Sequence, residues 1–265
     1  MAEKTAHFRF YAELNDFLRK HERYQTFRYA FMGTPSIKDA IEGIGVPHPE
    51  IDLIVVEGES VAFDYHLQDG DRVAVYPVFE SLDITPVVHL RPKPLRVTRF
   101  VLDVHLGKLA RMLRMLGFDS LYRTDFEDPE IVRVAAAEHR VILTRDIELL
   151  KANAVTHGYW VRSNVPDQQV SEVLDRFDLC NQVKPFKRCM VCNREIARVD
   201  KKAVLKELPP RVRERHDEFY RCDGCGKVYW KGTHYQDMMK RIQRLSKAGG
   251  DNGRDGKGIS HEESP

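Results

Sequence analysis

The 265-residue sequence has no long hydrophobic run. No stretch approaches the roughly 20 apolar residues that a membrane-spanning helix needs. Residues 1–20 also lack the hydrophobic centre of a secretory signal peptide. No internal repeat is visible. We therefore expect a soluble, cytoplasmic protein without a membrane partner.

Cysteine is scarce, and four of the five cysteines form two close pairs, Cys189-Met-Val-Cys192 and Cys222-Asp-Gly-Cys225. This spacing favours metal binding in a reducing compartment over a disulfide framework. Two C-x-x-C pairs can fill the tetrahedral sphere of one Zn²⁺, leaving no open position for catalysis. We predict structural zinc at these four residues. The 29 residues between the pairs exceed the usual ribbon gap of about 15–20, so we expect an inserted loop around residues 208–210.

A large excess of charge of one sign is also missing, because the net charge is only +2. The charge is nevertheless unevenly distributed. Residues 1–80 hold 8 Lys+Arg against 14 Asp+Glu, giving −6, and residues 183–248 hold 18 against 8, giving +10. A basic C-terminal region favours a polyanionic partner such as RNA. A solvated basic surface without a partner is the alternative.

The middle of the chain alternates short apolar runs with helical patterns, and acids follow the apolar runs. A run ending at Leu102 is followed by Asp103, and a run over residues 141–143 is followed by Asp146. Between them the pattern predicts a helix that ends at Gly117, a short strand over 120–123 and a helix that opens at Asp128-Pro129. Strands that alternate with helices indicate a parallel sheet, which binds ligands beyond the carboxyl ends of its strands.

Asp103 and Asp146 are therefore expected at the same edge of the sheet. Clustered carboxylates repel each other unless a cation neutralises them, and hard oxygen ligands suit Mg²⁺ or Mn²⁺. Such a site is typical of phosphodiester hydrolysis. Each aspartate taken alone can instead be a turn residue or a helix cap.

Several of these segments resemble a known family. Asp103 with the helix Leu-Gly-Lys-Leu-Ala-Arg, Asp128-Pro129, and Val-Ile-Leu-Thr-Arg-Asp ending at Asp146 closely resemble the Mut-seven C-terminal RNase domain family, a branch of the PIN-like nucleases. The resemblance continues through both cysteine pairs to His234. It implies a PIN-like fold, Mg²⁺- or Mn²⁺-dependent RNA cleavage and an appended zinc ribbon.

The resemblance adds two acids to the candidate site. Asp128 becomes a candidate metal ligand, with Glu130 as its substitute, although an Asp before Pro is also a good helix cap. Asp167 matches the fourth acid of PIN-like enzymes, although a negative charge at a helix N-terminus is favourable in itself. The catalytic prediction is thus Asp103, Asp128, Asp146 and Asp167. We expect RNA contacts from five basic residues: Lys108, Arg111, Arg145, Arg188 and Lys231.

The first 80 residues form a separate pattern: two alternating strands, a helix that opens at Ser36 and closes at Gly45, a strand over 51–56, and a final strand that follows Asp69-Gly70. This order resembles the ubiquitin-like β-grasp fold, in particular the sulfur carriers of thiamine and molybdopterin synthesis. Those carriers end in a reactive Gly-Gly, whereas this chain continues through Phe79-Glu80-Ser81. We therefore interpret the domain as a module that binds a protein partner, positions substrate or supports the fold.

The fold prediction is a multidomain α/β and α+β protein. It comprises a ubiquitin-like β-grasp domain in residues 1–81, an extended linker in 82–95, a PIN-like domain with a parallel sheet in 96–182, a zinc ribbon and terminal helix in 183–248, and a disordered tail in 249–265. The predicted function is metal-dependent RNA hydrolysis. The alternatives are a non-catalytic RNA- or ribonucleoprotein-binding scaffold and a protein-interaction adaptor.

Overall fold

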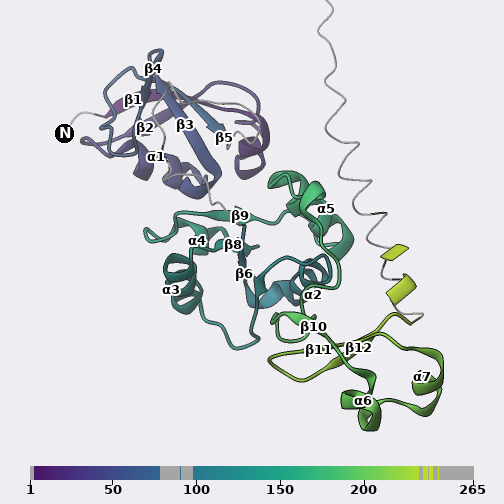
Figure 1. The fold of residues 1–265 in the computed structure, drawn as a ribbon. Coiled ribbons are helices and arrows are strands. Elements are labelled where there is room, and N and C mark those ends of the chain that lie inside the picture. Colours follow the sequence, from purple (N-terminus) through teal and green to yellow (C-terminus); the bar gives the residue numbers. More distant parts are fainter. Residues whose placement is uncertain are drawn as a thin grey trace, which may run out of the picture. The chain divides into compact units, whose positions relative to one another are not determined.

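The structure is a computed structural model of the chain, and it describes residues 3–77, 90, 98–232, 235–237, 239, 240 and 244 (Figure 1). The chain divides into two compact units, residues 1–106 with 122–160 and residues 107–121 with 161–265. Apart from Leu90, the predicted linker lies outside the described residues. The predicted tail and much of the predicted terminal helix also lie outside them.

The first unit contains a five-stranded sheet in the order β2-β1-β5-β3-β4. The central strand β5 runs parallel to β1, and the other pairs are antiparallel. The helix α1 (Ile37–Ile44) lies against one face of this sheet (Figure 1). This is a ubiquitin-like β-grasp arrangement. The strands are β1 (Lys4–Phe10), β2 (Phe27–Phe31), β3 (Ile51–Val56), β4 (Glu59–Val61) and β5 (Arg72–Pro77).

Buried and exposed side chains alternate along β1 and show which face of the sheet is covered. Phe8 and Phe10 point into the core, where they meet the buried side of α1, while His7 and Arg9 point to the opposite, exposed face. The helix begins where the Ser36 hydroxyl accepts a hydrogen bond from the backbone N–H of Asp39, at 3.1 Å. One face of the sheet is therefore packed and the other is solvated.

A second, parallel sheet in the same unit contains β6 (Phe100–Leu102), β8 (Val141–Thr144) and β9 (Gly158–Trp160), with β8 paired to both of the others. All residues of β6 and β8 are buried, as expected for a parallel sheet covered on both faces. The helices α3 (Asp128–Glu138) and α4 (Ile147–Lys151) pack on this sheet. The predicted order of strand, helix and acid is confirmed here.

The short helix η2 (His48–Glu50) connects the ubiquitin-like domain to β9. The buried Glu50 Oε1 accepts a hydrogen bond from the backbone N–H of Trp160 at 2.6 Å, and His48 Nε2 lies 2.6 Å from the carbonyl oxygen of Val155. The ring of Phe17 lies 5.0 Å from that of Trp160. The ubiquitin-like domain therefore has direct polar and aromatic contacts with the parallel sheet.

The second unit contains a pair of packed helices and a small antiparallel sheet. The pair consists of α2 (Gly107–Met115) and α5 (Pro166–Arg176), and β7 (Ser120–Leu121) follows α2. The sheet has the order β10-β11-β12. Its strands are β10 (Ile196–Val199), β11 (Phe219–Cys222) and β12 (Val228–Trp230).

The long gap between the cysteine pairs contains more than the expected loop. It folds into α6 (Lys201–Val204), η5 (Leu205–Glu207) and α7 (Pro210–Arg215). Val204 and Leu208 are buried against Phe219 of β11, so the insertion has a small core of its own. This apolar cluster is separate from the one around Cys189, Cys222 and Tyr229.

The end of α2 is joined closely to the ribbon. Gly117 follows the helix with φ 98°, and a Cβ added there would lie 2.1 Å from the carbonyl oxygen of Lys184. The backbone N–H of Lys184 donates a hydrogen bond to Leu116 O at 2.9 Å. Glycine is therefore required at this position both by the left-handed backbone and by the approach of the chain that enters the ribbon.

The same junction contains a buried arginine. Arg114 of α2 is 4% exposed and donates hydrogen bonds to the carbonyl oxygens of Ser120, Met190 and Val191 at 2.8, 3.4 and 2.8 Å. Lys108, Arg111 and Arg114 recur every three residues, a spacing that by itself places all three on one basic face of the helix. The Arg114 guanidinium instead donates its hydrogen bonds to the buried carbonyl groups of the ribbon and of β7.

Within the part of the chain that the structure describes, none of the helices combines the length and the hydropathy needed to cross a membrane.

Candidate active site and metal centre

Asp103 follows directly after β6, at the carboxyl edge of the parallel sheet. It is 5% exposed, and its backbone N–H continues the pairing with β8 by donating to Leu143 O at 3.1 Å. The turn η3 (Val104–Leu106) begins immediately afterwards, and Leu106 N–H donates to Asp103 O at 2.9 Å. The backbone on both sides of Asp103 is thus fixed by hydrogen bonds.

Thr144, the last residue of β8, connects the two predicted acids. Its fully buried hydroxyl donates to Asp103 Oδ2 at 2.8 Å and accepts a hydrogen bond from the backbone N–H of Asp146 at 2.9 Å. Our sequence reasoning missed this role. A hydroxyl-bearing residue at the end of an otherwise aliphatic strand was the available signal.

Asp146 is exposed and caps α4, because its Oδ1 accepts a hydrogen bond from the backbone N–H of Glu148 at 2.8 Å. The helix-cap alternative is therefore realised at Asp146. Capping uses one carboxylate oxygen and holds the side chain beside Thr144, so it does not compete with a role in the acid cluster.

Asp128 is exposed at the first turn of α3, where Glu127 occupies the N-cap position. Partial burial raises the pKa of Asp128, and the carboxylates of Asp146 and Asp103 raise it further. The charges of Asp103 and Asp146 thus repel that of Asp128 within the same unit, although the three residues are far apart in the sequence. A cation would relieve this repulsion, and the carboxylate oxygens suit Mg²⁺ or Mn²⁺.

The acids fit a hard cation in charge and donor type. Among the described residues, however, the four cysteines form a group of ligand atoms that could already hold an ion, and Asp103, Asp128 and Asp146 do not.

The remaining acidic candidates are Glu130 and Asp167. Glu130 Oε1 accepts a hydrogen bond from Arg123 Nη1 at 2.9 Å, which occupies the proposed substitute for Asp128. Asp167 is exposed in the first turn of α5, in the second unit.

Three of the predicted phosphate-binding residues are exposed in the structure. Lys108 and Arg111 are exposed on α2, and Arg145 is exposed next to Asp146. The carbonyl oxygen of Arg145 accepts a hydrogen bond from Trp160 Nε1 at 3.2 Å, so the backbone there is held while the side chain remains at the surface.

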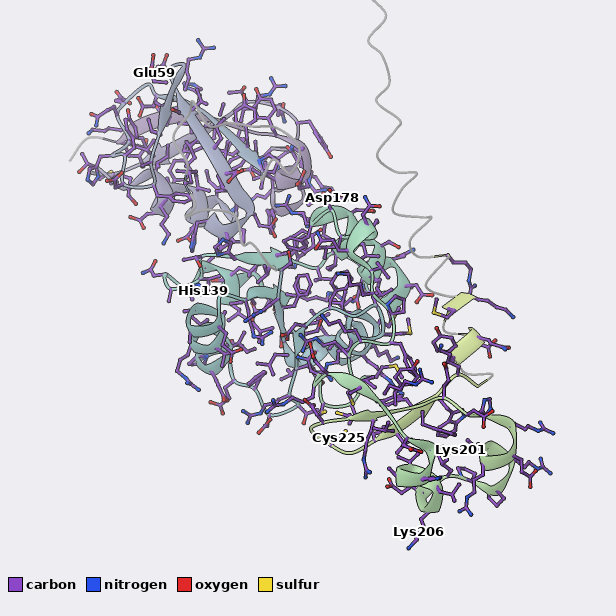
Figure 2. All side chains as sticks on the ribbon, viewed as in Figure 1. Glu59, His139, Asp178, Lys201, Lys206 and Cys225 are labelled. Carbon is purple, nitrogen blue, oxygen red and sulfur yellow. The ribbon has the colours of Figure 1, made fainter. Side chains whose placement is uncertain are left out.

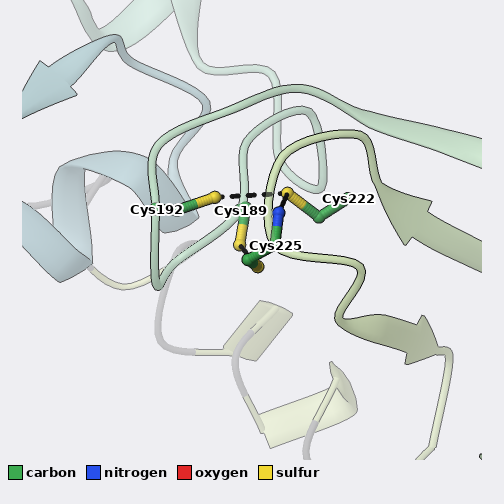
Figure 3. Close-up of side chains that lie close together, drawn as sticks. All are labelled: Cys189, Cys192, Cys222 and Cys225. Carbon is green, nitrogen blue, oxygen red and sulfur yellow. Dashed lines mark hydrogen bonds between the residues drawn. The ribbon is translucent and has the colours of Figure 1, made fainter.

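The four cysteine side chains point toward one another from two turns of the ribbon (Figure 3). Cys189 Sγ lies 3.6 Å from Cys225 Sγ, and Cys192 Sγ lies 3.3 Å from Cys222 Sγ. Tetrahedral zinc with Zn–S bonds of about 2.3 Å requires sulfur atoms about 3.8 Å apart. The thiols therefore fit structural zinc, and the grouping of these four cysteines is confirmed.

Hydrogen bonds prepare Cys189 for metal binding. The Tyr229 hydroxyl lies 3.1 Å from Cys189 Sγ. Burial acts to raise the pKa of Cys189, but hydrogen bonds from Tyr229 and from the backbone N–H groups of Cys192 and Val191 lower it to about 6. A thiolate at neutral pH is the form that zinc binds.

The other basic candidates lie in the ribbon and have acidic partners. Arg188 Nη2 lies 3.3 Å from Asp119 Oδ2, and Lys231 Nζ lies 2.9 Å from Glu218 Oε2. By contrast, Lys206 points away from the ribbon into solvent (Figure 2). The basic surface of the ribbon is thus partly neutralised by its own carboxylates.

A parallel α/β sheet with acids at its carboxyl edge, together with a four-cysteine ribbon, defines a nuclease-like protein that also carries a ubiquitin-like domain. The chain belongs to the Mut7-C RNAse domain family, whose model matches residues 98–242. The Mut7-C ubiquitin family matches residues 3–83, so both predicted resemblances are confirmed in the predicted order. No curated protein and no solved structure matches the chain.

Proposed function

We propose that this chain hydrolyses RNA phosphodiester bonds with Mg²⁺ or Mn²⁺ held by Asp103, Asp128 and Asp146, with Asp167 as a fourth acid. The observation that carries the proposal is the hydrogen-bonded link from Asp103 through Thr144 to Asp146. A binding scaffold for a polyanion gains nothing from carboxylates gathered at one sheet edge, whereas a divalent cation requires them.

Each residue has a distinct part in this proposal. Asp103, buried and oriented by Thr144, would hold the cation after the end of β6. Asp146, held at the surface by its cap on α4, would be a second ligand. When bound, the cation supplies water activation and stabilisation of the developing negative charge. Arg145, Lys108 and Arg111 are exposed cations that can hold phosphate groups.

We also propose that zinc in the ribbon is structural, and that the ribbon adds affinity for RNA through Arg188 and Lys231. Both residues would exchange an acidic partner for a phosphate group on binding. The module boundaries predicted from the sequence, and a protein partner for the ubiquitin-like domain, belong to the same proposal.

The test is cleavage of labelled single-stranded and hairpin RNA by zinc-loaded protein with Mn²⁺, with Mg²⁺, or with neither metal added. Asp146→Asn is the informative variant, because asparagine caps helices as well as aspartate does and the fold should survive. We expect metal-dependent cleavage by the wild type, and loss of at least a hundredfold in rate in the variant with RNA binding retained.

The matched control is Asp125→Asn, which removes an exposed carboxylate that pairs with Arg123 outside the acid cluster. Its cleavage rate should equal that of the wild type. Binding without cleavage in every metal, or equal cleavage by Asp146→Asn, would overturn the proposal and favour the RNA-binding scaffold.

A further inference from the structure

The solvated face of the ubiquitin-like sheet contains a cavity of about 490 Å³. Its floor is formed in part by Ala74 of β5, which pairs with Arg9 of β1 on one side and Val55 of β3 on the other. A small side chain between longer neighbours in the centre of the sheet creates the hollow. The volume lies within the range of small-molecule sites, about 300–1,000 Å³.

Cations are concentrated around this cavity. His7, Arg9 and Arg72 line it, and Arg28 is paired with His7 on the neighbouring strand β2. Residues directly opposite each other on adjacent strands share one face, so His7 lies in a row between Arg28 and Arg72. Three of the eight Lys and Arg residues in residues 1–80 thus gather on one face of a segment whose net charge is −6.

The cavity is lined by a carboxylate as well. Glu57 Oε1 accepts a hydrogen bond from the backbone N–H of Arg72 at 2.8 Å. Its charge is therefore partly stabilised by the main chain. The surroundings of the cavity remain positive even with Glu57 counted.

Aromatic rings form one side of the same face. The rings of Tyr11 and Tyr76 stack with centroids 4.4 Å apart and an angle of 10° between their planes. The Arg9 guanidinium lies over the Tyr11 ring, 5.3 Å from its centroid. The stack holds Arg9 at the cavity wall, and the guanidinium retains donors that can bind a phosphate in a bidentate manner.

We propose that this cavity binds one nucleotide of a single-stranded RNA, with Arg9 and Arg72 on phosphate groups and Tyr11 beside the base. The inference rests on the proposed function, since the RNA would be the substrate of the nuclease domain. Planar arginines beside aromatic rings match the phosphate and the base of a nucleotide. An acidic peptide would use the charges but leave the aromatic wall without a role.

The test measures binding of a labelled 12-nucleotide single-stranded RNA to the full zinc-loaded chain in buffer without Mg²⁺ or Mn²⁺, where the proposed cleavage cannot proceed. Arg9→Gln with Arg72→Gln should weaken binding about tenfold and lower the salt dependence by about 1.4 in log–log slope, because each phosphate contact on a single strand contributes about 0.7. Ala74→Phe, which fills the cavity without changing charge, should weaken binding similarly.

The matched control is Arg19→Gln with Lys20→Gln, which removes two exposed cations from the same domain away from the sheet face. It should bind RNA like the wild type. Thermal unfolding of each variant would verify that the fold is intact. Equal weakening by the control pair, or wild-type binding by Ala74→Phe, would overturn the proposal, and so would tighter, cavity-dependent binding of a glutamate-rich peptide of equal charge.

Cleavage in Mn²⁺ at saturating RNA separates this proposal from the proposed function. Cavity variants should keep the wild-type maximal rate while needing more RNA to reach it. If the wild type fails to cleave RNA, the nuclease proposal fails, while the binding result without Mg²⁺ or Mn²⁺ still decides the cavity proposal.

Discussion

The molecule has two candidate metal centres, and they are built in opposite ways. Four thiols converge within 4.8 Å in the ribbon, and hydrogen bonds from Tyr229 and the backbone already surround them. At the edge of the parallel sheet, Asp103 is buried while Asp128 and Asp146 are exposed, and among the described residues the three do not form a comparable ligand group. The cysteine site is closed and the acid site is open.

The difference follows from the chemistry of the ligands and from their tasks. Thiols are neutral in their usual form and can pack together before a metal arrives, whereas carboxylates are charged and repel. That repulsion contributes to the raised pKa of Asp128. A structural ion needs a filled coordination sphere, while a catalytic ion needs open positions for water and substrate. The spacing of the acids is thus compatible with a site that RNA completes.

Breaking the closed site should have the largest effect. Cys222→Ser, or removal of zinc with a chelator, should unfold the ribbon, because structural zinc contributes about 10 kcal/mol or more to small zinc domains. Since Arg114 and Gly117 join α2 to the ribbon, hydrogen exchange should also lose protection in α2. Hydrogen-exchange mass spectrometry with and without chelator measures both effects.

Cys180→Ser is the matched control, because Cys180 is a free cysteine outside the group of four. It should keep the zinc content and the exchange pattern of the wild type. Unchanged protection of α2 in a protein that has lost its zinc would show that the ribbon and α2 fold independently.

Substitution of Arg114 tests how much the hydrogen bonds between α2 and the ribbon contribute to stability. Arg114→Met leaves the buried carbonyl groups of Ser120, Met190 and Val191 without this donor and should lower the free energy of unfolding by about 3 kcal/mol. Arg111→Met removes the same charge from the exposed side of α2 and should cost less than about 0.5 kcal/mol. Urea unfolding of the zinc-loaded variants gives both values, and equal losses would contradict this role of Arg114.

Local patterns were sufficient for most elements of the fold. The capping of α1 by Ser36, the end of α2 before Gly117 and the fully buried β8 follow from residue types and spacing within a few positions. The cysteine pairs identified the ribbon for the same reason, because two ligands on one short turn constrain each other locally.

Long-range relations were harder to predict. Tyr76-Pro77 is typical of an edge strand, yet β5 lies in the centre of its sheet, and Pro77 is accommodated at the strand end opposite a register shift between Ile51 and Leu53. Periodicity placed Arg114 on a basic face, although its partners are 76 and 77 residues away. Such partners become visible only when the chain is folded. The role of Thr144 could not be predicted for the same reason, because its partner Asp103 is 41 residues away.

The smallest expected effect concerns the open site. Burial, Asp146 and Asp103 raise the pKa of Asp128 above its ordinary value of 3.8, so the folded chain holds this proton more tightly than the unfolded chain does. The free energy of unfolding therefore falls as the pH rises from the unfolded-state pKa of Asp128 to its folded-state pKa. Above the folded-state pKa the destabilisation is complete and no longer changes with pH. Asp128→Asn should accordingly raise the melting temperature at pH 7 without divalent metal, and this advantage should vanish below about pH 3.8.

Asp125→Asn should have the opposite sign at pH 7. The hydrogen bond from Arg123 lowers the pKa of Asp125, so its carboxylate stabilises the fold above the unfolded pKa, and this contribution is lost as the pH falls through the folded pKa. Adding Mn²⁺ should remove or reverse the advantage of Asp128→Asn, because a cation among the acids turns repulsion into attraction. Melting curves of the zinc-loaded variants at several pH values, with and without Mn²⁺, test these expectations. A lower melting temperature of Asp128→Asn than of the wild type at pH 7 without Mn²⁺ would show that the Asp128 carboxylate stabilises the fold. Charge repulsion among the acids would then not be the dominant effect at this site.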